Sequence, residues 1–499
     1  MAAETTKSDS AETATKEPTD WGKYGRRPLV LLALVALIDA VDRGILPGVL
    51  DEVQDALDFS DFQAGFLGTA FVITGFLVVI PAGYIADRYP RTRIIAVVLA
   101  SWGVISALNA AVTSYAQFAA VRAMLGVGET IDNPSSQSLI ADYYKPTLRG
   151  RAYAFQRVAP TVGTALGTIL GGVVAAIAGW RWAFLVVGVP GSLLALAVWR
   201  LPEPERGEHD ELVEAVSEHA LELEAEVETD SIGFGVSETS YARLGDAKTS
   251  EDDRVGEERA DRRGVKAVVR DAKRVLEVPT LRYLIAGTAL ASGALAGIGF
   301  WGPSFFSRQT PLTSGQAAGV AGGLILVGAL AGTLFGGFLT DRLRGRVEGA
   351  PMVVAGVTQA LGAVFLMIVF LPTPLAVKLP MSVIGVLLIV AGFPALTAMT
   401  AEVVPAEIRG LTFSVTSFLS ALVSAASPLV IGALADQFDF VTKNGQIKGN
   451  LGNAFLIVTP LVIVGALVVL RGRRYVAQDT LRAAESRAEG FPDEPVRSD

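Results

Sequence analysis

Seven ionisable side chains of this chain lie inside long apolar stretches of its first half. They are Asp39, Asp42, Arg43, Arg122, Glu129, Asp132 and Arg157. If these stretches cross a bilayer, each charge near its centre costs roughly 2.5 to 3.5 kcal/mol on insertion scales. Charges retained at that cost indicate ion pairs, proton transfer or the binding of a charged ligand.

The seven residues comprise four acids and three arginines, so one carboxylate has no arginine to neutralise it. A carboxylate without a counter-charge in surroundings of low dielectric constant tends to take up a proton, and it can release that proton when its surroundings change. We therefore expect a proton-linked acid, with Glu129 or Asp42 preferred, Asp39 next, and Asp132 completing the charge network. The alternative is a static network that fixes helix packing.

Helix geometry indicates which of these groups meet. Arg122 and Glu129 are seven residues apart, which is two helical turns, so they share one face at a separation of about 10 Å. Counted from the outer ends of their stretches, Asp42 and Arg122 reach similar depths, and we predict that they pair. By the same counting, Arg157 could approach Asp132. The three arginines are the candidates for ion pairing or for holding an anionic substrate head group.

The composition places the chain among membrane proteins, because 51% of its 499 residues are hydrophobic and only 18% are charged. The chain has no cysteine, and both histidines, His209 and His219, fall in one acidic segment. Disulfides, thiolate sites and buried histidine–metal sites are thereby excluded, and we expect neither a metal nor a cofactor. A net charge of −8 argues against a basic surface for nucleic acid.

Twelve apolar runs are long enough to cross about 30 Å of hydrocarbon as helices, at ~1.5 Å per residue. The first six are 28–50, 62–84, 93–112, 116–141, 150–178 and 181–200. The second six are 281–306, 315–340, 350–371, 380–403, 410–433 and 453–470. The sequence therefore predicts an all-α membrane protein with two six-helix bundles, residues 28–200 and 281–470.

Basic residues in the short loops fall consistently on one side of the predicted membrane. They are Arg88, Arg91, Arg93, Lys145, Arg149, Arg151, Arg342, Arg344, Arg346 and Arg409. The positive-inside rule places these loops in the cytoplasm of a cell-membrane protein, together with a disordered tail at 1–27 and a second tail at 471–499. The loop from Asp51 to Asp61 on the opposite side is acidic.

An acidic linker at 201–280 separates the two bundles. Residues 203–261 carry 20 acidic and 5 basic side chains, which gives a net charge of −15. The following segment, 262–277, is basic and has apolar residues at helical spacing, so we expect an amphipathic helix on the cytoplasmic membrane surface. A solvated charged linker helix is the alternative interpretation.

The two bundles share an internal repeat. Gly83 and the pair Asp87-Arg88 recur 254 residues later as Gly337 and Asp341-Arg342. At an offset of 260, Pro134, Asp142, Arg149, Gly150 and Gly172 meet Pro394, Glu402, Arg409, Gly410 and Gly432. Two repeated halves predict a cavity between them near the bilayer midplane, reached alternately from each side.

The segment Gly83-Tyr-Ile-Ala-Asp87-Arg88-Tyr-Pro-Arg91-Thr-Arg93 resembles the loop signature of the major facilitator superfamily, and the resemblance covers about residues 28–470. It implies a transporter that works by alternating access and not an enzyme. In this motif Gly83 would allow close helix approach, and Asp87 would join the arginines in a cytoplasmic charge network that breaks when the halves move. A simple positive-inside anchor explains the arginines alone.

Within that superfamily, Asp42-Arg43 and the run from Arg122 to Glu129 are similar to the spinster-like lipid transporters. Anion:cation symporters of sugar acids carry related residues. Since the second half has almost no ionisable residue away from its span ends, a lysolipid-like substrate would fit, with its head on the first half and its tail along the second. We expect a monomer that contacts substrate, proton and membrane lipid. A proton-coupled organic-anion symporter and an uncoupled facilitator remain alternatives.

Overall fold

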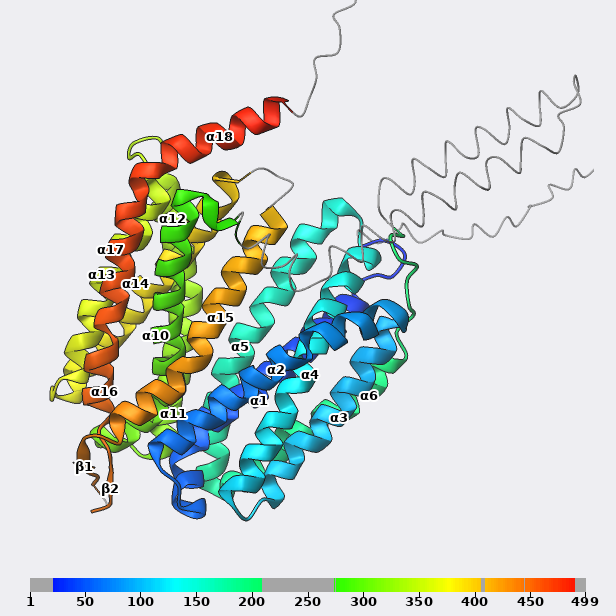
Figure 1. Ribbon diagram of the computed structural model, residues 1–499. Coiled ribbons are helices and arrows are strands. Elements are labelled where there is room, and N and C mark those ends of the chain that lie inside the picture. The colour runs from blue at the N-terminus through cyan, green and yellow to red at the C-terminus, as the bar shows by residue number, and fades with distance from the viewer. Residues whose placement is uncertain (1–20, 209–272, 274, 405–408, 444, 490–499) are drawn as a thin grey trace, which may run out of the picture.

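The computed structural model describes residues 21–208, 273, 275–404, 409–443 and 445–489 (Figure 1). At 77, 79–87, 129–134 and 484–489 it describes the backbone alone. The predicted basic helix at 262–277 lies almost wholly outside the described residues. The same holds for most of the tail 1–27 and of the acidic linker 201–280.

Helices account for nearly all of the described chain. In the first half they are α1 (Arg27–Leu57), α2 (Asp61–Arg88), α3 (Arg91–Leu108) with the short η1 (Asn109–Ala111), α4 (Tyr115–Tyr143), α5 (Pro146–Ala178) and α6 (Trp180–Trp199). In the second half they are α10 (Pro279–Gln309), α11 (Ser314–Val327), η2 (Gly328–Gly332), α12 (Thr333–Leu343), α13 (Ala350–Phe370), α14 (Leu375–Glu402), α15 (Arg409–Ala435), α16 (Leu451–Val458) and α17 (Pro460–Gly472). The eighth predicted span comprises α11, the π-helical η2 and α12, and the twelfth comprises α16 and α17.

Within the described part of the chain, nine helices are long and apolar enough to cross a membrane, judged by length and composition. The other three predicted spans are α1, α2 and α4. Of these, α1 and α4 carry six of the seven charges that the sequence places in apolar stretches. The predicted all-α fold with two six-helix halves is confirmed.

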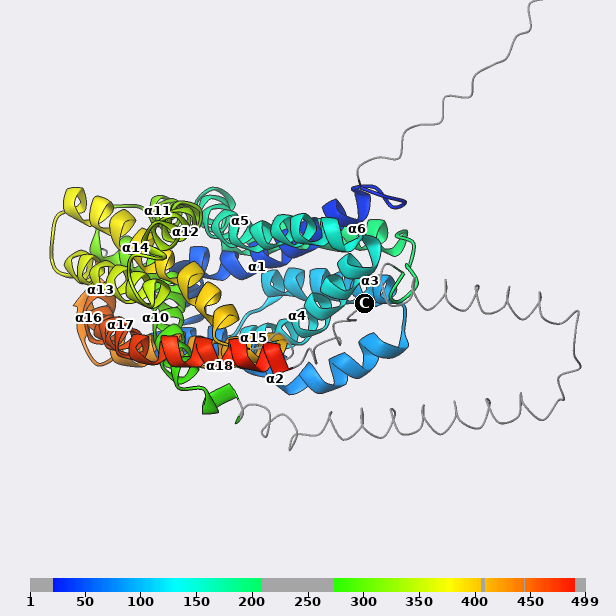
Figure 2. The ribbon, with the colours of Figure 1, turned by 90° about the horizontal axis from the view of Figure 1, so that it is seen from above.

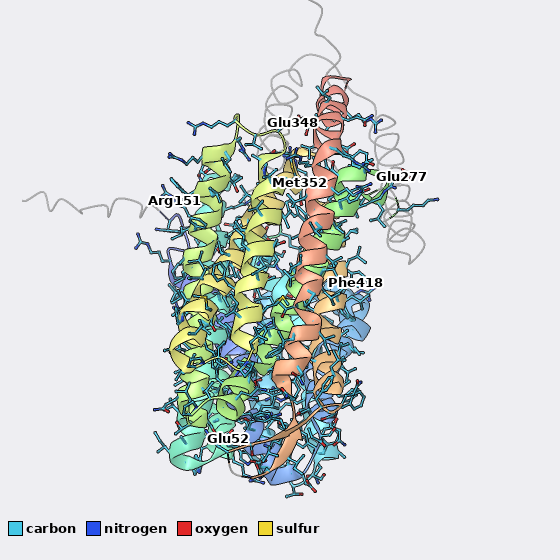
Figure 3. All side chains as sticks on the ribbon, turned by 90° about the vertical axis from the view of Figure 1, so that its left-hand side faces the viewer. Glu52, Arg151, Glu277, Glu348, Met352 and Phe418 are labelled. Carbon is cyan, nitrogen blue, oxygen red and sulfur yellow. The ribbon has the colours of Figure 1, made fainter. Side chains whose placement is uncertain are left out.

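The basic loops and the acidic loop lie at opposite ends of the molecule. Figure 3 places Arg151 and Glu348 at one end and Glu52 at the other. We call the first the inner end, since it holds the loops predicted to face the cytoplasm, and the other the outer end. At the outer end, α15 is followed by an antiparallel hairpin of β1 (Asp439–Val441) and β2 (Ile447–Gly449).

The two halves meet at the outer end and diverge toward the inner end (Figure 1), and they lie side by side when viewed from above (Figure 2). Between them α2 packs on α15 and α5 packs on α11. A Cβ added to Gly65 would lie 2.3 Å from the Pro428 carbonyl oxygen, and one added to Gly322 would lie 2.7 Å from that of Ala165. Glycine is needed at both crossings because the backbones nearly touch. The structure is therefore closed at its outer end and inward-facing.

The glycine-rich face of α5 lies against α1 and fixes the depth of the charged residues on α1. A Cβ on Gly44 would lie 2.3 Å from the Thr164 carbonyl oxygen, and one on Gly167 would lie 2.0 Å from the Val41 carbonyl oxygen. Small residues permit such close helix approach in membranes. Asp42 and Arg43 are thus held level with the middle of α5.

Replacing Gly167 with Val is expected to disrupt this packing. Overpacking typically costs about 1–3 kcal/mol, and here the clash is with backbone that cannot rotate away. Thermal unfolding of the purified variant in detergent should therefore begin several degrees lower, on the order of 5 °C. Gly319→Ala is the control, because a Cβ at that helical glycine would meet nothing within 4 Å. Equal melting of Gly167→Val and the parent protein would contradict the packing account.

The predicted tail after residue 470 is in part a helix. A 3₁₀ turn, η4 (Arg473–Tyr475), leads into α18 (Val476–Glu489), which turns away from α17 across the inner end (Figure 1). The buried Asp479 carboxylate accepts the backbone N–H of Thr280 at 2.8 Å, in the first turn of α10. Carboxylates stabilise helix N-termini because free N–H groups gather there, so α18 caps α10.

Candidate functional site

A buried ion pair joins α1 to α4. Arg122 Nη1 lies 3.7 Å from Asp42 Oδ2, and both side chains are almost completely buried. The Ser106 hydroxyl of α3 donates a hydrogen bond to the other oxygen of Asp42. The pairing of Asp42 with Arg122 expected from their depths is therefore present, with a third helix supporting it.

Aromatic rings enclose the Arg122 guanidinium. It lies 5.5 Å from the ring centroid of Phe118 and 5.0 Å from that of Phe184. Its Nε and Nη2 atoms are buried and have no hydrogen-bond partner within the described residues. An arginine does not lose its proton in proteins, so Arg122 stays charged. That buried charge is stabilised by Asp42 and by the faces of the two rings.

A second ion pair lies one turn away on α1. Arg43 Nη2 is 3.0 Å from Asp39 Oδ2, and the Arg43 side chain keeps 35% of its surface exposed. Arg43 lines a cavity between the halves, whereas Arg122 is buried behind α1 and does not line it. Of these two predicted head-group arginines, Arg43 is thus the one that a substrate in this cavity can reach.

The cavity has a volume of about 640 Å³, within the usual range for small-molecule sites. We call it the central cavity. The first half contributes Arg43, Pro47, Pro160, Thr161, Thr164 and Thr168. Apart from Ser292, Ser382 and two glycines, the second half contributes apolar residues, among them Leu295, Phe300, Phe305, Phe306, Leu324, Leu366, Phe370, Val390 and Phe455. Arg43 is the only ionisable residue that lines the cavity within the described chain.

A second pocket of about 420 Å³ lies on the inner side of the central cavity, and the two share Ser292 and Phe393. We call it the inner vestibule. Arg157 of α5 lines it together with Leu284, Thr288, Leu396, Thr397, Thr400, Phe413, Thr416, Ser417 and Ser420 of the second half. Arg157 is solvent-exposed. The side chain of Asp132, its expected partner, lies outside the described residues.

The side chains of several other predicted site residues are likewise outside the described part of the chain. The backbone places Glu129 and Asp132 on α4, and Gly83 and Asp87 on α2, but their side chains lie outside the described ones. The second motif copy is described. There Asp341 and Arg342 are exposed, and a Cβ on Gly337 would meet nothing within 4 Å. The close backbone approach is at the preceding residue, Gly336, where a Cβ would lie 2.0 Å from the Ala391 carbonyl oxygen.

At the inner end, the buried Arg91 connects α3 to α4 and to the chain after α6. Its guanidinium binds the Asp142 carboxylate and lies 2.9 Å from Glu203. Arg344 binds Glu402 in the second half. Asp142 and Glu402 correspond in the internal repeat, so both halves contain an arginine–carboxylate contact at this end. Arg88, which follows Asp87 in the predicted motif, is exposed.

The contribution of Glu203 to the stability of this network depends on pH. Burial acts to raise the pKa of Glu203, but hydrogen bonds from the Thr92 backbone N–H and from Arg91 outweigh burial and hold that pKa below its ordinary value. Glu203 therefore stabilises the fold above the ordinary carboxyl pKa. That contribution is lost as the pH falls through the lowered pKa of the folded state.

We expect Glu203→Gln to lower the free energy of unfolding by about 1 kcal/mol at pH 7, a value reduced for partial exposure. The difference in the free energy of unfolding between variant and parent should become smaller as the pH is lowered below 4. Thermal melting in detergent across that pH range measures it, with the exposed Glu205→Gln as the control. A gap that stays constant with pH would show that the Glu203 charge is not the stabilising feature.

A cluster of charged residues that was not predicted from the sequence holds the halves together at the outer end. The buried Arg308, at the end of α10, donates to both Asp61 oxygens at 2.8 and 2.9 Å, to Asp51 at 2.9 Å and to Gln54 at 2.7 Å. Nearby, Lys448 lies 2.6 Å from Asp55. The signal was available, since Arg308 closely follows a predicted span and faces an acidic loop without basic residues.

Within the described residues, every ion pair that joins the two halves lies in this outer cluster. Asp436 adds to it, because its carboxylate accepts the backbone N–H groups of Asp61 and Phe62 at 3.1 and 2.8 Å, at the start of α2. The described ion pairs of the inner end each stay within one half. Opening the outer end therefore requires these contacts to separate.

Comparison with known proteins agrees with the fold. The family model described as Major Facilitator Superfamily matches residues 32–428. Protein spinster homolog 3 of Danio rerio is 26% identical over 492 residues, which cover 94% of this chain and 88% of that protein. The sphingosine-1-phosphate transporter SPNS2 of Danio rerio is 23% identical, covering 92% and 87% of the two chains.

Among solved structures, a bacterial homologue of the human lysosomal transporter Spinster, inward-facing and unoccupied, matches with a TM-score of 0.69. The match has 20% sequence identity and covers 95% of this chain and 100% of that one. The predicted resemblance to spinster proteins is thus confirmed. The chain belongs to the Major Facilitator Superfamily, as a spinster-like transporter and not an enzyme.

Proposed function

We propose that this chain is a secondary active transporter that moves a single-chain, anionic amphiphile by alternating access and couples this movement to a proton. The central cavity carries the substrate part of the proposal. One cation, Arg43, faces a wall that is mainly apolar across the second half. A lysolipid-like molecule would place its charged head toward Arg43 and its tail along α10, α13 and α14.

The relative named for sphingosine-1-phosphate supports this substrate class, since that molecule combines a phosphate head with a long apolar tail. A sugar acid has no apolar part and would leave most of the cavity wall without a partner. Burying apolar substrate surface contributes roughly 25 cal/mol per Å², so an acyl chain gains affinity there and a sugar acid does not.

The proton part of the proposal rests on the buried Asp42 and the half-buried Asp39 of α1, and on Glu129 of α4. Asp42 accepts a hydrogen bond from Ser106, but its negative charge is offset by Arg122 across a long contact of 3.7 Å. Protonation of Asp42 would release Arg122, and deprotonation would restore the ion pair. The contact between α1 and α4 would therefore change with each proton bound or released. We place the protein in the cell membrane as a monomer, with the inner end and both termini in the cytoplasm.

Uptake into proteoliposomes tests the substrate class. Purified protein reconstituted with an imposed pH gradient should take up tritiated lysophosphatidate but not a labelled sugar acid such as galactonate. Leu366→Asp, which places a charge on the apolar wall of the central cavity, should reduce lysophosphatidate uptake at least tenfold, equivalent to about 1.4 kcal/mol. Uptake of galactonate without lysophosphatidate would favour the organic-anion symporter.

A further inference from the structure

The inner vestibule differs chemically from the central cavity that it adjoins. Seven of its twelve lining residues are Ser or Thr, and its one ionisable residue is Arg157. The central cavity is mainly apolar. Because Ser292 and Phe393 line both, a single elongated molecule can extend from one into the other.

Two hydroxyl groups of the vestibule have unused hydrogen-bonding capacity. Thr288 Oγ1 on α10 and Ser420 Oγ on α15 are buried and have no hydrogen-bond partner among the described residues. By contrast, Thr397, Thr400 and Thr416 donate to carbonyl oxygens one turn earlier in their own helices. A buried polar group without a partner is costly, so Thr288 and Ser420 would gain from a ligand that brings acceptor oxygens.

Arg157 faces these hydroxyls from the opposite half. It belongs to α5, whereas Thr288 and Ser420 belong to the second bundle. A guanidinium and two hydroxyl donors that converge from three helices match an oxyanion such as phosphate or carboxylate. Since the donors come from both halves, this arrangement is that of the inward-facing state, and it changes when the halves move against each other.

The inner vestibule lies between Arg43 and the inner end of the molecule. Gly44, next to Arg43, packs against Thr164 of α5, and Arg157 lies seven residues closer to the inner end. At ~1.5 Å per residue the two arginines differ in depth by about 10 Å. An anionic head could therefore pass from one arginine to the other without fully leaving positive charge.

Resting on the proposed function, we infer that the inner vestibule is a second head-group subsite, which holds the oxyanion of the amphiphile in the inward-facing state. Arg157, Thr288 and Ser420 bind the head, and the tail stays in the central cavity. Arg43 then holds the head at the midplane, and Arg157 holds it where substrate exchanges with the cytoplasm.

Equilibrium binding to the purified full chain in detergent tests this with two probes that share one tail, oleoyl-lysophosphatidate and uncharged monooleoylglycerol. The parent protein should prefer lysophosphatidate by at least tenfold, about 1.4 kcal/mol, because only this probe accepts charge-assisted hydrogen bonds. Arg157→Gln should reduce that preference to about threefold or less, with binding of monooleoylglycerol unchanged. A purely structural role for Arg157 would weaken both probes alike.

Three further variants sharpen the test. Arg157→Lys should keep part of the preference, and Thr288→Val with Ser420→Ala should reduce it by about threefold to tenfold. Arg151→Gln is the matched control, an exposed α5 arginine outside both pockets, and it should leave the preference unchanged. Inorganic phosphate in millimolar excess should displace lysophosphatidate from the parent if the subsite also accepts free anions, and only weakly if it requires a lipid head.

The outcomes separate this inference from the proposed function. If Arg157→Gln keeps the full preference while Arg43→Gln abolishes it, the head group stays at Arg43, and the vestibule subsite is refuted although amphiphile transport stands. If the parent protein binds neither amphiphile, the proposed function itself fails, and the inference fails with it.

Discussion

Replacing Arg308 with Gln is expected to open the outer end. Arg308 binds Asp51 and Asp61 from the opposite half, and its side chain is only 2% exposed. Removing one partner of a buried ion pair typically costs about 3–5 kcal/mol. Much of that loss falls on the inward-facing state, because the contacts cross the interface that separates during opening. The ratio of outward-facing to inward-facing molecules should rise by at least a hundredfold, about 2.7 kcal/mol.

The absence of cysteine makes this shift measurable, since a single introduced cysteine is the only thiol. Ala321→Cys places it on α11 in the wall of the central cavity. A membrane-impermeant maleimide added from the outside should label this thiol slowly in the parent background and rapidly with Arg308→Gln. Arg181→Gln is the control, because that outer-end arginine bonds to Val112 of its own half. Unchanged labelling with Arg308→Gln would mean that the cluster does not keep the outer end closed.

The second large effect is expected at Asp42. Asp42→Asn leaves the buried Arg122 without its counter-charge, and we expect both a loss of stability of about 3–5 kcal/mol and a loss of proton-driven transport. Either outcome alone would also follow from a static ion pair. The double variant Asp42→Asn with Arg122→Gln separates the two interpretations, because it removes the uncompensated charge.

If the pair only fixes helix packing, the double variant should recover thermal stability and proton-driven uptake together. If Asp42 binds the transported proton, stability should return while uptake stays insensitive to the pH gradient. Thermal melting and proteoliposome uptake, measured on the same preparations, check both readouts. Recovery of proton-driven uptake would remove Asp42 from the proton-linked role and leave Glu129 as the preferred acid.

The sequence predicted most of the fold because the twelve spans are set by local composition. The pairing of Asp42 with Arg122 was also predictable. Their helices run in opposite directions between the same two surfaces, so counting residues from the outer end gives depth directly. The central cavity is charged on one side and mainly apolar on the other, and this difference was predictable from the lack of charges in the second half. It depends on residue types alone, which the sequence shows without the packing.

Contacts between distant segments were not predictable in the same way. Arg308 and Asp61 are 247 residues apart, and they meet only because the two halves close at the outer end. In α18, the Asp479 carboxylate bonds to the start of α10, which lies 199 residues earlier in the chain. The π-helical η2 replaces part of an expected continuous helix, and it packs its Gly328 against Val386 of α14.

Proton movement driven by substrate tests the central claim most directly. Proteoliposomes that enclose a pH-sensitive dye, with no initial pH gradient, would receive lysophosphatidate on one side only. Coupled transport predicts a pH change inside that depends on the protein and is abolished by the double variant of Asp42 and Arg122. If the parent protein takes up lysophosphatidate without any change in internal pH, proton coupling is contradicted and the chain is an uncoupled facilitator.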